Sequence, residues 1–243
     1  MNNWKKLLLA LLLTAPPGHA AENAVLEELV WSQSDGLRQE IYHSARTAAG
    51  WSEPEQLTDN NANNLHPAFV IAPDSSRWIF WSAVNPDGIS IEYTVGKAGR
   101  WTQPVQLESG HATAITPAAL IGPDQTLWLA WAGNDGGQDE IYWSRFVNAA
   151  WLPPQQINAA NQVPDVKPEL LLNKQGQVEV RWQGFRDGKY KWLAAVYAGQ
   201  GWSPEQDFIE EEEQAAEPEE LPDFLPADSQ HVLLAVPAGK EAE

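Results

Sequence analysis

Two glutamate–tyrosine pairs are the residues of this 243-residue chain whose types could do acid–base chemistry. Glu40 stands two residues before Tyr42, and Glu140 stands two residues before Tyr142. A tyrosine can act as a nucleophile when a neighbouring carboxylate takes its proton. Both pairs nevertheless recur at equivalent positions of a repeat, whereas an enzyme site needs one unique set of groups. We therefore predict no catalytic residue.

The same positions carry residue types that suit binding of a polyhydroxylated ligand. Aromatic rings stack on sugar faces, while charged side chains form hydrogen bonds with hydroxyl groups. The sequence predicts a ligand-binding site from residues of the first and third repeats: Arg38, Glu40, Tyr42, Glu140, Tyr142, Trp143 and Arg145. The pattern is incomplete in the other two repeats, so packing of cross-strand pairs remains the alternative interpretation.

Metal and cofactor chemistry have little support in the sequence. The histidines that follow residue 20 are scattered, without the close pairing of zinc ligands; they are His43, His66, His111 and His231. The chain has no cysteine, which excludes thiol chemistry and disulfides. Ser32 and Ser82 lack a nucleophile-elbow context. We predict no metal and no cofactor.

A tryptophan repeat of about fifty residues must position these side chains. One set of tryptophans is spaced 50, 50 and 51 residues apart, and a second set follows with the same spacing. The first set is Trp31, Trp81, Trp131 and Trp182, and the second is Trp51, Trp101, Trp151 and Trp202. A period near fifty with aromatic anchors is typical of stacked supersecondary units.

Each repeat reads as four antiparallel strands joined by short turns. Prolines open an apolar run at Pro67, Pro117 and Pro168, and we expect each to be the first residue of a strand. Asp-Gly pairs predict tight hairpins at Asp35-Gly36, Asp87-Gly88, Asp135-Gly136 and Asp187-Gly188. Prolines in the fourth segment indicate an edge strand. The fold class is therefore all-β and β-propeller-like, with four blades plus a partial C-terminal unit.

The repeat units predict one domain over residues 21–243. The units span about 29–57, 67–107, 117–157, 168–206 and 222–236, and an acidic connector spans 207–221. The chain enters at the second strand of its first unit, so the missing first strand is expected from the C-terminus. In the last unit, 222–225 reads as a first strand and 231–235 as a second. This gives one strand too many, so either one strand lies outside the ring or the ring is open and completes itself by self-association.

The first twenty residues read as a signal peptide. Lys5 and Lys6 precede an apolar stretch over 7–13 and a small-residue cleavage pattern at 18–20. That stretch is too short for a membrane span, which needs ~20 apolar residues. We predict a bacterial protein that is periplasmic or secreted.

Charge excludes two classes of partner. Without the first twenty residues the chain holds 13 basic and 33 acidic residues, and such a surface repels nucleic acid and anionic lipid. The glutamate run over 210–220 is read as a solvated connector, with calcium binding as the weaker alternative.

The repeats resemble the sialidase-like, Asp-box (BNR-like) β-propellers of bacteria, and more loosely the fucose-binding propeller lectins. The likeness rests on the Trp-x-x-Pro strand ends, the Asp-Gly hairpins, and two segments that half-match an Asp box, at 74–78 and 124–128. The Arg-Ile-Pro motif that opens a sialidase is missing. The resemblance implies a blade scaffold and either a lectin-like protein or a diverged glycoside hydrolase. We predict a non-catalytic binding protein for carbohydrate or another envelope protein, with the hydrolase as the alternative.

Overall fold

A computed structural model describes residues 27–159, 161–209, 225 and 229–235. Every element in these residues is a β-strand. No helix of the described part is long and apolar enough to cross a membrane. The predicted signal peptide and most of the acidic connector lie outside the described residues.

The strands form four antiparallel blades, each with three long strands and a short outer edge. Blade one consists of β19 (Gln230–Ala235), β1 (Glu27–Ser34), β2 (Gln39–Thr47), β3 (Gly50–Trp51) and β4 (Glu55–Gln56). Blade two consists of β5 (Asn63–Ile71), β6 (Arg77–Asn85), β7 (Gly88–Lys97), β8 (Arg100–Trp101) and β9 (Val105–Gln106). Blade three consists of β10 (Thr113–Ile121), β11 (Leu127–Asn134), β12 (Glu140–Val147), β13 (Ala150–Trp151) and β14 (Gln155–Gln156). Blade four consists of β15 (Asp165–Leu172), β16 (Val178–Arg186), β17 (Lys189–Val196) and β18 (Gln206–Asp207).

The C-terminal strand completes the first blade, as the sequence predicts. β19 pairs with β1 in antiparallel register, with Leu29 opposite Leu234. The sequence pattern predicts that residues 231–235 form the second strand of a fifth unit. In the structure this segment is instead the missing first strand of blade one, so that assignment is wrong. The expected first strand over 222–225 lies outside the described residues except for Leu225, which is in a bend.

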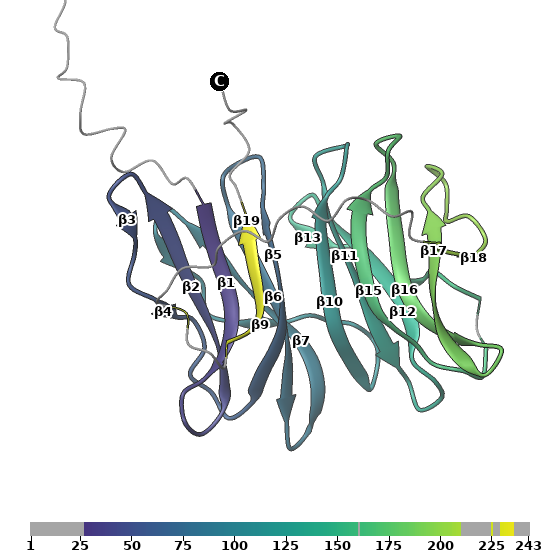
Figure 1. The fold of residues 1–243 in the computed structure, drawn as a ribbon, viewed down its shortest axis with the longest axis horizontal. Coiled ribbons are helices and arrows are strands. Elements are labelled where there is room, and N and C mark those ends of the chain that lie inside the picture. The colour runs from purple at the N-terminus through teal and green to yellow at the C-terminus, as the bar shows by residue number, and fades with distance from the viewer. Residues whose placement is uncertain (1–26, 160, 210–224, 226–228, 236–243) are drawn as a thin grey trace, which may run out of the picture.

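The four blades stand in a row, not in a closed ring. Figure 1 shows blade one at the left end and blade four at the right end of the longest axis. Among the described residues, buried apolar clusters fill the three junctions between consecutive blades, and none joins blade four to blade one. The architecture is that of a β-propeller whose blades fan out without closing.

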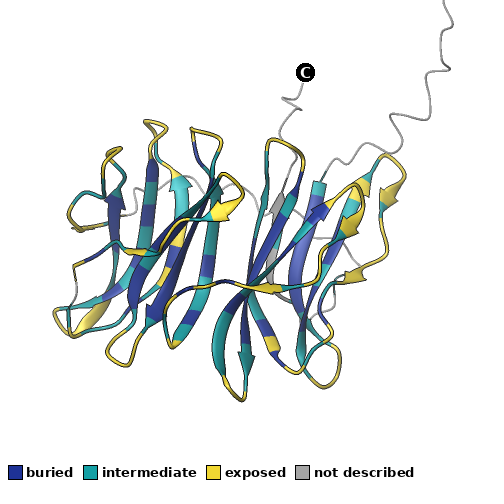
Figure 2. Ribbon diagram, turned by 180° about the vertical axis from the view of Figure 1, so that it is seen from behind, coloured by how far each residue is buried: buried dark blue, intermediate teal, exposed yellow. Residues whose placement is uncertain are grey.

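The repeated tryptophans fill the blade junctions. All four residues of the first set are fully buried. Trp81, Trp131 and Trp182 each face the preceding blade, because each belongs to the cluster at that junction. Tryptophans of the second set also pack against the preceding blade. The ring of Trp202 in blade four, for example, lies 6.2 Å from the ring of Trp128 in blade three. Figure 2 shows that burial follows the strands while the turns at both ends are exposed.

The repeated prolines do not begin strands, which corrects the sequence prediction. Pro67, Pro117 and Pro168 lie inside β5, β10 and β15, at a register shift typical of a β-bulge. The residue before each proline has a positive φ, of 51° at His66, 50° at Thr116 and 53° at Lys167. The residues of a bulge are skipped by the ladder, so the missing N–H of proline costs no hydrogen bond there.

The predicted turns are present and explain two sequence motifs. The glycine of every Asp-Gly pair has a positive φ, between 79° and 145°, as tight hairpins require. The half-matched Asp boxes are turns before the second strand. The Asp74 Oδ1 atom accepts hydrogen bonds from the Ser76 N–H at 3.0 Å and from the Ser76 Oγ at 2.6 Å. In both segments the aspartate stabilises the turn.

The outer edge of each blade is broken into short pieces. In blades one to three the fourth segment forms two pairs of residues on either side of its prolines. The prediction of an edge strand is consistent with this arrangement, because proline cannot donate a ladder hydrogen bond.

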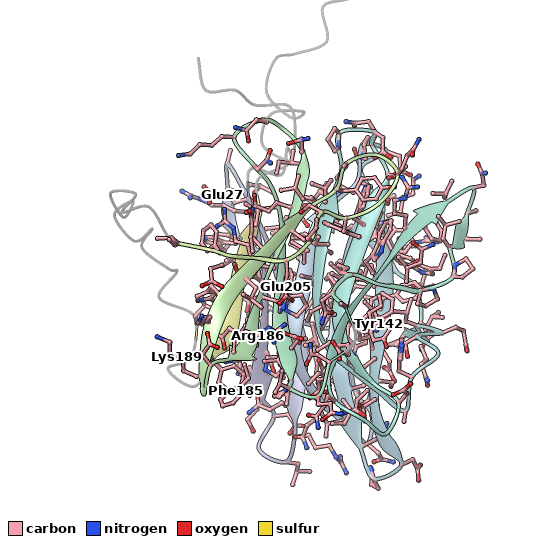
Figure 3. The ribbon with its side chains drawn as sticks, turned by 90° about the vertical axis from the view of Figure 1, so that its right-hand side faces the viewer. Glu27, Tyr142, Phe185, Arg186, Lys189 and Glu205 are labelled. Carbon is pink, nitrogen blue, oxygen red and sulfur yellow. The ribbon has the colours of Figure 1, made fainter. Side chains whose placement is uncertain are left out.

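The outward side of β16 is polar at positions where the corresponding strand of blade three is apolar. Glu179, Arg181 and Gln183 occupy the positions at which blade three directs Trp128, Ala130 and Ala132 toward its neighbour. Figure 3 looks onto this end of the row, where Arg186 and Glu205 point toward each other. Their side chains form a bidentate pair with distances of 3.0 and 2.8 Å. At the other end, Leu29 and Trp31 face away from blade two, and both are fully buried.

Candidate functional site

A hollow in the surface of the molecule lies beside blade two. It has a volume of about 570 Å³, a size typical of small-molecule sites. The connectors before and after blade two, its β6–β7 hairpin, β7 and β9 supply the lining. The residues of the lining are Asn60, Asn61, Ala62, Asn85, Pro86, Asp87, Gly88, Ile89, Ser90, Glu92, Gln106, Ser109, His111 and Ala112.

In blades one and three, a buried polar network occupies the equivalent region. Glu40 is only 1 % exposed and accepts hydrogen bonds from the Thr58 hydroxyl and from the Asn64 Nδ2 at 2.9 Å. Thr58 accepts in turn from the backbone N–H of Ile41. Burial raises the pKa of Glu40, although these hydrogen bonds act to lower it. The carboxylate therefore ties the end of its own blade to the connector that leads into the next one.

Blade three repeats this network with different partners. Glu140 is 6 % exposed and accepts from the Asn158 amide and from the backbone N–H of Asn161 at 3.1 Å. Asn158 also donates to Asp165, the first residue of β15, at 2.8 Å. Burial raises the pKa of Glu140 too. The two glutamates are therefore scaffold residues in both blades.

Blade two lacks this network because the three key side chains are replaced. Backbone hydrogen bonds from Leu57 to Ile41 and from Leu107 to Ile91 fix the register between the first two blades. In this register Ser90, Glu108 and Ala114 stand at the positions of Glu40, Thr58 and Asn64. Ser90 and Ala114 are small and Glu108 is exposed, so nothing in these positions fills the space that the network fills elsewhere. The cavity lies at this break in the repeat.

Glu92 lines the cavity at a position that tyrosine occupies in blades one and three. Glu92 lies opposite Trp81 across the β6–β7 ladder, as Tyr42 lies opposite Trp31 and Tyr142 opposite Trp131. Among the described residues, no side chain or backbone group forms a hydrogen bond or ion pair with its carboxylate. Desolvation by burial raises the pKa of Glu92, and no other group contributes to the shift.

His111 is the second titratable group of unusual environment in the lining. Its ring lies 3.8 Å from the ring of Tyr142, and Gly133 leaves room for this contact because a Cβ there would lie 2.9 Å from Tyr142. Its Nδ1 atom is buried without a hydrogen-bond partner among the described residues. Burial lowers the pKa of His111, against opposing contributions from Asp135 and the Ser109 backbone contact. The imidazole is therefore neutral near pH 7, with one ring nitrogen able to donate a hydrogen bond and the other able to accept one.

The lining as a whole suits a polar ligand of small size. Amides, hydroxyls, one imidazole and two carboxylates face the space, and the lining contains no lysine, arginine or aromatic ring apart from His111. Such groups can bind hydroxyls through many weak hydrogen bonds. No group of three or more His, Asp or Glu side chains able to hold a metal ion occurs in the described part of the chain.

The predicted site residues of blade one lie outside this cavity. Arg38 belongs to the β1–β2 hairpin, where its backbone N–H donates to Asp35 Oδ1 at 2.7 Å. Tyr42 stacks on Trp31 with ring centroids 5.8 Å apart, and its hydroxyl donates to Gln56 at 3.2 Å. Tyr42 thus packs within its own blade, and Glu40 joins that blade to the connector and the first strand of blade two.

The predicted residues of blade three are divided between two faces. Tyr142 faces blade two and its ring contacts the ring of His111, whereas Glu140 is hydrogen-bonded to the connector that leads into blade four. Trp143 and Arg145 face blade four, where they line a smaller cavity of about 180 Å³. Arg145 lies 4.9 Å above the ring of Trp128 and pairs with Asp124 at 3.3 Å. The four side chains therefore do not form one site.

Comparison with known proteins shows likeness in fold. No protein-family model matches the chain, and the curated proteins give no significant match. A protein of unknown function from Dyadobacter fermentans has a TM-score of 0.55 at 12 % identity, covering 70 % of this chain and 58 % of its own. An endo-arabinase from Bacteroides thetaiotaomicron has a TM-score of 0.52 at 15 % identity, covering 77 % of this chain and 82 % of its own. A polysaccharide lyase of family PL25, an ulvan lyase, has a TM-score of 0.50 at 11 % identity, covering 68 % and 48 %. The chain spans little more than half of the Dyadobacter protein and less than half of the ulvan lyase.

Glu92 and His111 are not among the site residues that the sequence predicts. The sequence pattern aligns Tyr93 with Tyr42, whereas the backbone register places Glu92 at the position of Tyr42, two residues beyond Ser90. The sequence does contain a signal for Glu92, because this residue differs from the tyrosine at the same position of the first and third repeats. A residue that departs from the repeat is not explained by the repeated scaffold. Without coordinates, the register needed to see this departure is ambiguous by one residue.

Proposed function

We propose that this protein is a non-catalytic carbohydrate-binding β-propeller, and that the cavity beside blade two holds the sugar. The observation that carries the proposal is the break in the repeat, which replaces a buried polar network by a hollow lined with amides, hydroxyls and a free carboxylate. The cavity of about 570 Å³ has the size of a site for one or two sugar rings.

The chemistry of the lining supports a polyhydroxylated ligand over an apolar one. Asn60, Asn85 and Gln106 offer amides that both donate and accept hydrogen bonds, and Ser90 adds a hydroxyl. Alternating donors and acceptors match the hydroxyls of a sugar. The endo-arabinase and the ulvan lyase, which share the fold, are carbohydrate-active proteins by their descriptions, and this likeness is consistent with the proposal.

We further propose that the protein acts in the periplasm or outside the cell. The proposal rests on the basic, apolar and small-residue pattern of the first twenty residues. An exported protein without cysteine must be stabilised by packing alone, and the tryptophan-filled blade junctions provide such packing.

Plugging the cavity tests the binding function. Ala112 is exposed in the lining, so the Ala112→Trp variant is expected to block the cavity with little effect on folding. Gln162→Trp is the matched control, because Gln162 is exposed at the equivalent position of the next connector. A glycan array identifies the ligand, and calorimetry then measures affinity. We expect at least a ~10-fold loss for Ala112→Trp and no change for the control. A silent array removes the carbohydrate proposal and leaves recognition of an envelope protein.

A diverged glycoside hydrolase is the second candidate, because the lining contains two carboxylates, Asp87 and Glu92. A glycoside hydrolase uses such a pair, with one member kept protonated by its environment. Binding remains our proposal, because no described residue forms a hydrogen bond with the Asp87 carboxylate at the exposed tip of its hairpin, whereas catalytic groups must be held in place. Turnover of fluorogenic glycosides that is abolished by Glu92→Gln would establish the hydrolase instead.

A further inference from the structure

The charges around the cavity point to a more specific ligand class than sugars in general. We infer that the blade-two cavity selects a ligand that carries a positively charged amine, such as a sugar with a free amino group. The inference rests on the proposed function, since it assigns a ligand class to the same cavity.

The first step is the state of Glu92 in the free protein. Its carboxylate is half-buried, faces the cavity and has no partner among the described residues. A charged group that is partly removed from water without a partner is destabilised. The buried glutamates of blades one and three have several hydrogen-bond donors each. Glu92 is thus the glutamate of this set that a ligand can still satisfy.

The second step is the absence of positive charge in the lining. The titratable groups that face the cavity are Asp87 on the hairpin, Glu92 on β7 and His111 on the connector to blade three. Burial lowers the pKa of His111, so it adds no positive charge near pH 7. The lining includes neither lysine nor arginine, and the whole chain has a formal charge of −18. An acidic sugar would therefore be repelled, whereas an ammonium group would be attracted.

The third step is the linkage between this pairing and pH. In the free protein the pKa of Glu92 lies above its ordinary value of 4.5, because burial disfavours the charged form. An ammonium group beside the carboxylate favours that charged form, so binding lowers the pKa and releases a proton. The affinity for an amine ligand should then increase with pH up to the raised pKa of free Glu92, and should level off above it until the amine itself loses its proton. A neutral sugar has no such dependence on Glu92.

Calorimetry with three matched probes and the full chain tests the inference. The probes are a glucosamine tetramer with free amines, its N-acetylated counterpart and a galacturonic acid tetramer. We expect the free-amine probe to bind at least ~10-fold more tightly than the N-acetylated one at pH 6.5, and the acidic probe not to bind. Glu92→Gln should remove this preference and its pH dependence. Glu108→Gln, an exposed carboxylate on the same blade outside the lining, controls for general attraction to an acidic protein.

The outcomes separate the inference from the proposed function. Equal or tighter binding of the N-acetylated probe overturns the amine preference but leaves carbohydrate binding in place. A free-amine preference that Glu108→Gln weakens as much as Glu92→Gln also overturns it, because surface charge then explains the result. If none of the probes binds, the inference is refuted. The proposed carbohydrate-binding function is then tested separately by the glycan array. Thermal melting of each variant confirms that it folds.

Discussion

Single side chains in this protein have meanings that depend on which blade carries them. Glu28 shows the structural case: it is 1 % exposed and accepts hydrogen bonds from Arg77 of blade two and His43 of its own blade. Burial alone raises the pKa of Glu28, but the bonds to His43 and Arg77 outweigh it, and the pKa lies below its ordinary value. Glu92 shows the opposite case, because nothing described in the protein satisfies it.

Removal of Arg77 should destabilise the protein strongly. Arg77→Ala leaves the Glu28 carboxylate buried with one fewer partner, and breaking a buried pair in this way costs about 3 kcal/mol. Denaturant unfolding measures the loss. Lys97→Ala is the control, because the Lys97–Asp74 pair is exposed and such pairs contribute about 0–1 kcal/mol. If the two variants lose equal stability, the pair between blades one and two does not act as described. The double variant Arg77→Ala with Glu28→Gln should recover part of the loss.

At the scale of the element, the inner strands share a strained bulge. β5, β10 and β15 each place a residue other than glycine at φ near 50° immediately before proline. The left-handed region costs roughly 1–2 kcal/mol per residue for side chains other than glycine. The bulge repeats at the same place in three blades, so we attribute it to the bend of the innermost strand and not to a single functional site.

Substitutions at Lys167 test this interpretation of the bulge. Lys167 is exposed and has a φ of 53°, so side-chain packing does not complicate the comparison. We expect Lys167→Gly to be more stable than Lys167→Ala by about 1 kcal/mol, because glycine adopts positive φ without steric cost. At an ordinary strand position the order is reversed. Thermal unfolding of the two variants decides between these orders.

At the scale of the whole molecule, the row of blades has two different ends. Blade four turns Glu179, Arg181 and Gln183 outward, where an internal blade would place apolar residues. Repeat arrays commonly end in units with a polar outer face, which keep the array soluble. The residues that face outward from blade one, Leu29 and Trp31, are already fully buried. Strand β16 therefore lacks the apolar side chains that another blade would cover, although Phe185, Tyr190 and Trp192 lie on the same side of the sheet nearer its end.

We expect the protein to be a monomer at micromolar concentration, which size-exclusion chromatography with light scattering measures. Self-association to complete a ring, which the strand count of the sequence leaves open, requires an apolar outer face. The triple variant Glu179→Trp, Arg181→Ala and Gln183→Ala supplies the side chains that blade three uses, so it should associate. A stable oligomer of the unmodified chain would contradict the role of blade four as a cap.

The amino-acid sequence alone determined the blade pattern, because tryptophan spacing, Asp-Gly hairpins and alternating apolar runs are local patterns that can be recognised in the sequence itself. It also indicated that the C-terminal strand joins the first blade, since the first unit lacks one strand. Only the tertiary structure decided that the row stays open and that the repeated prolines follow bulges, because both depend on how strands from different blades approach each other. The cavity beside blade two was likewise decided by the fold. Ser90, Ala114 and Glu92 are ordinary residues in the sequence, and they form a site only because the register of β7 places them where the neighbouring blades hold a buried network.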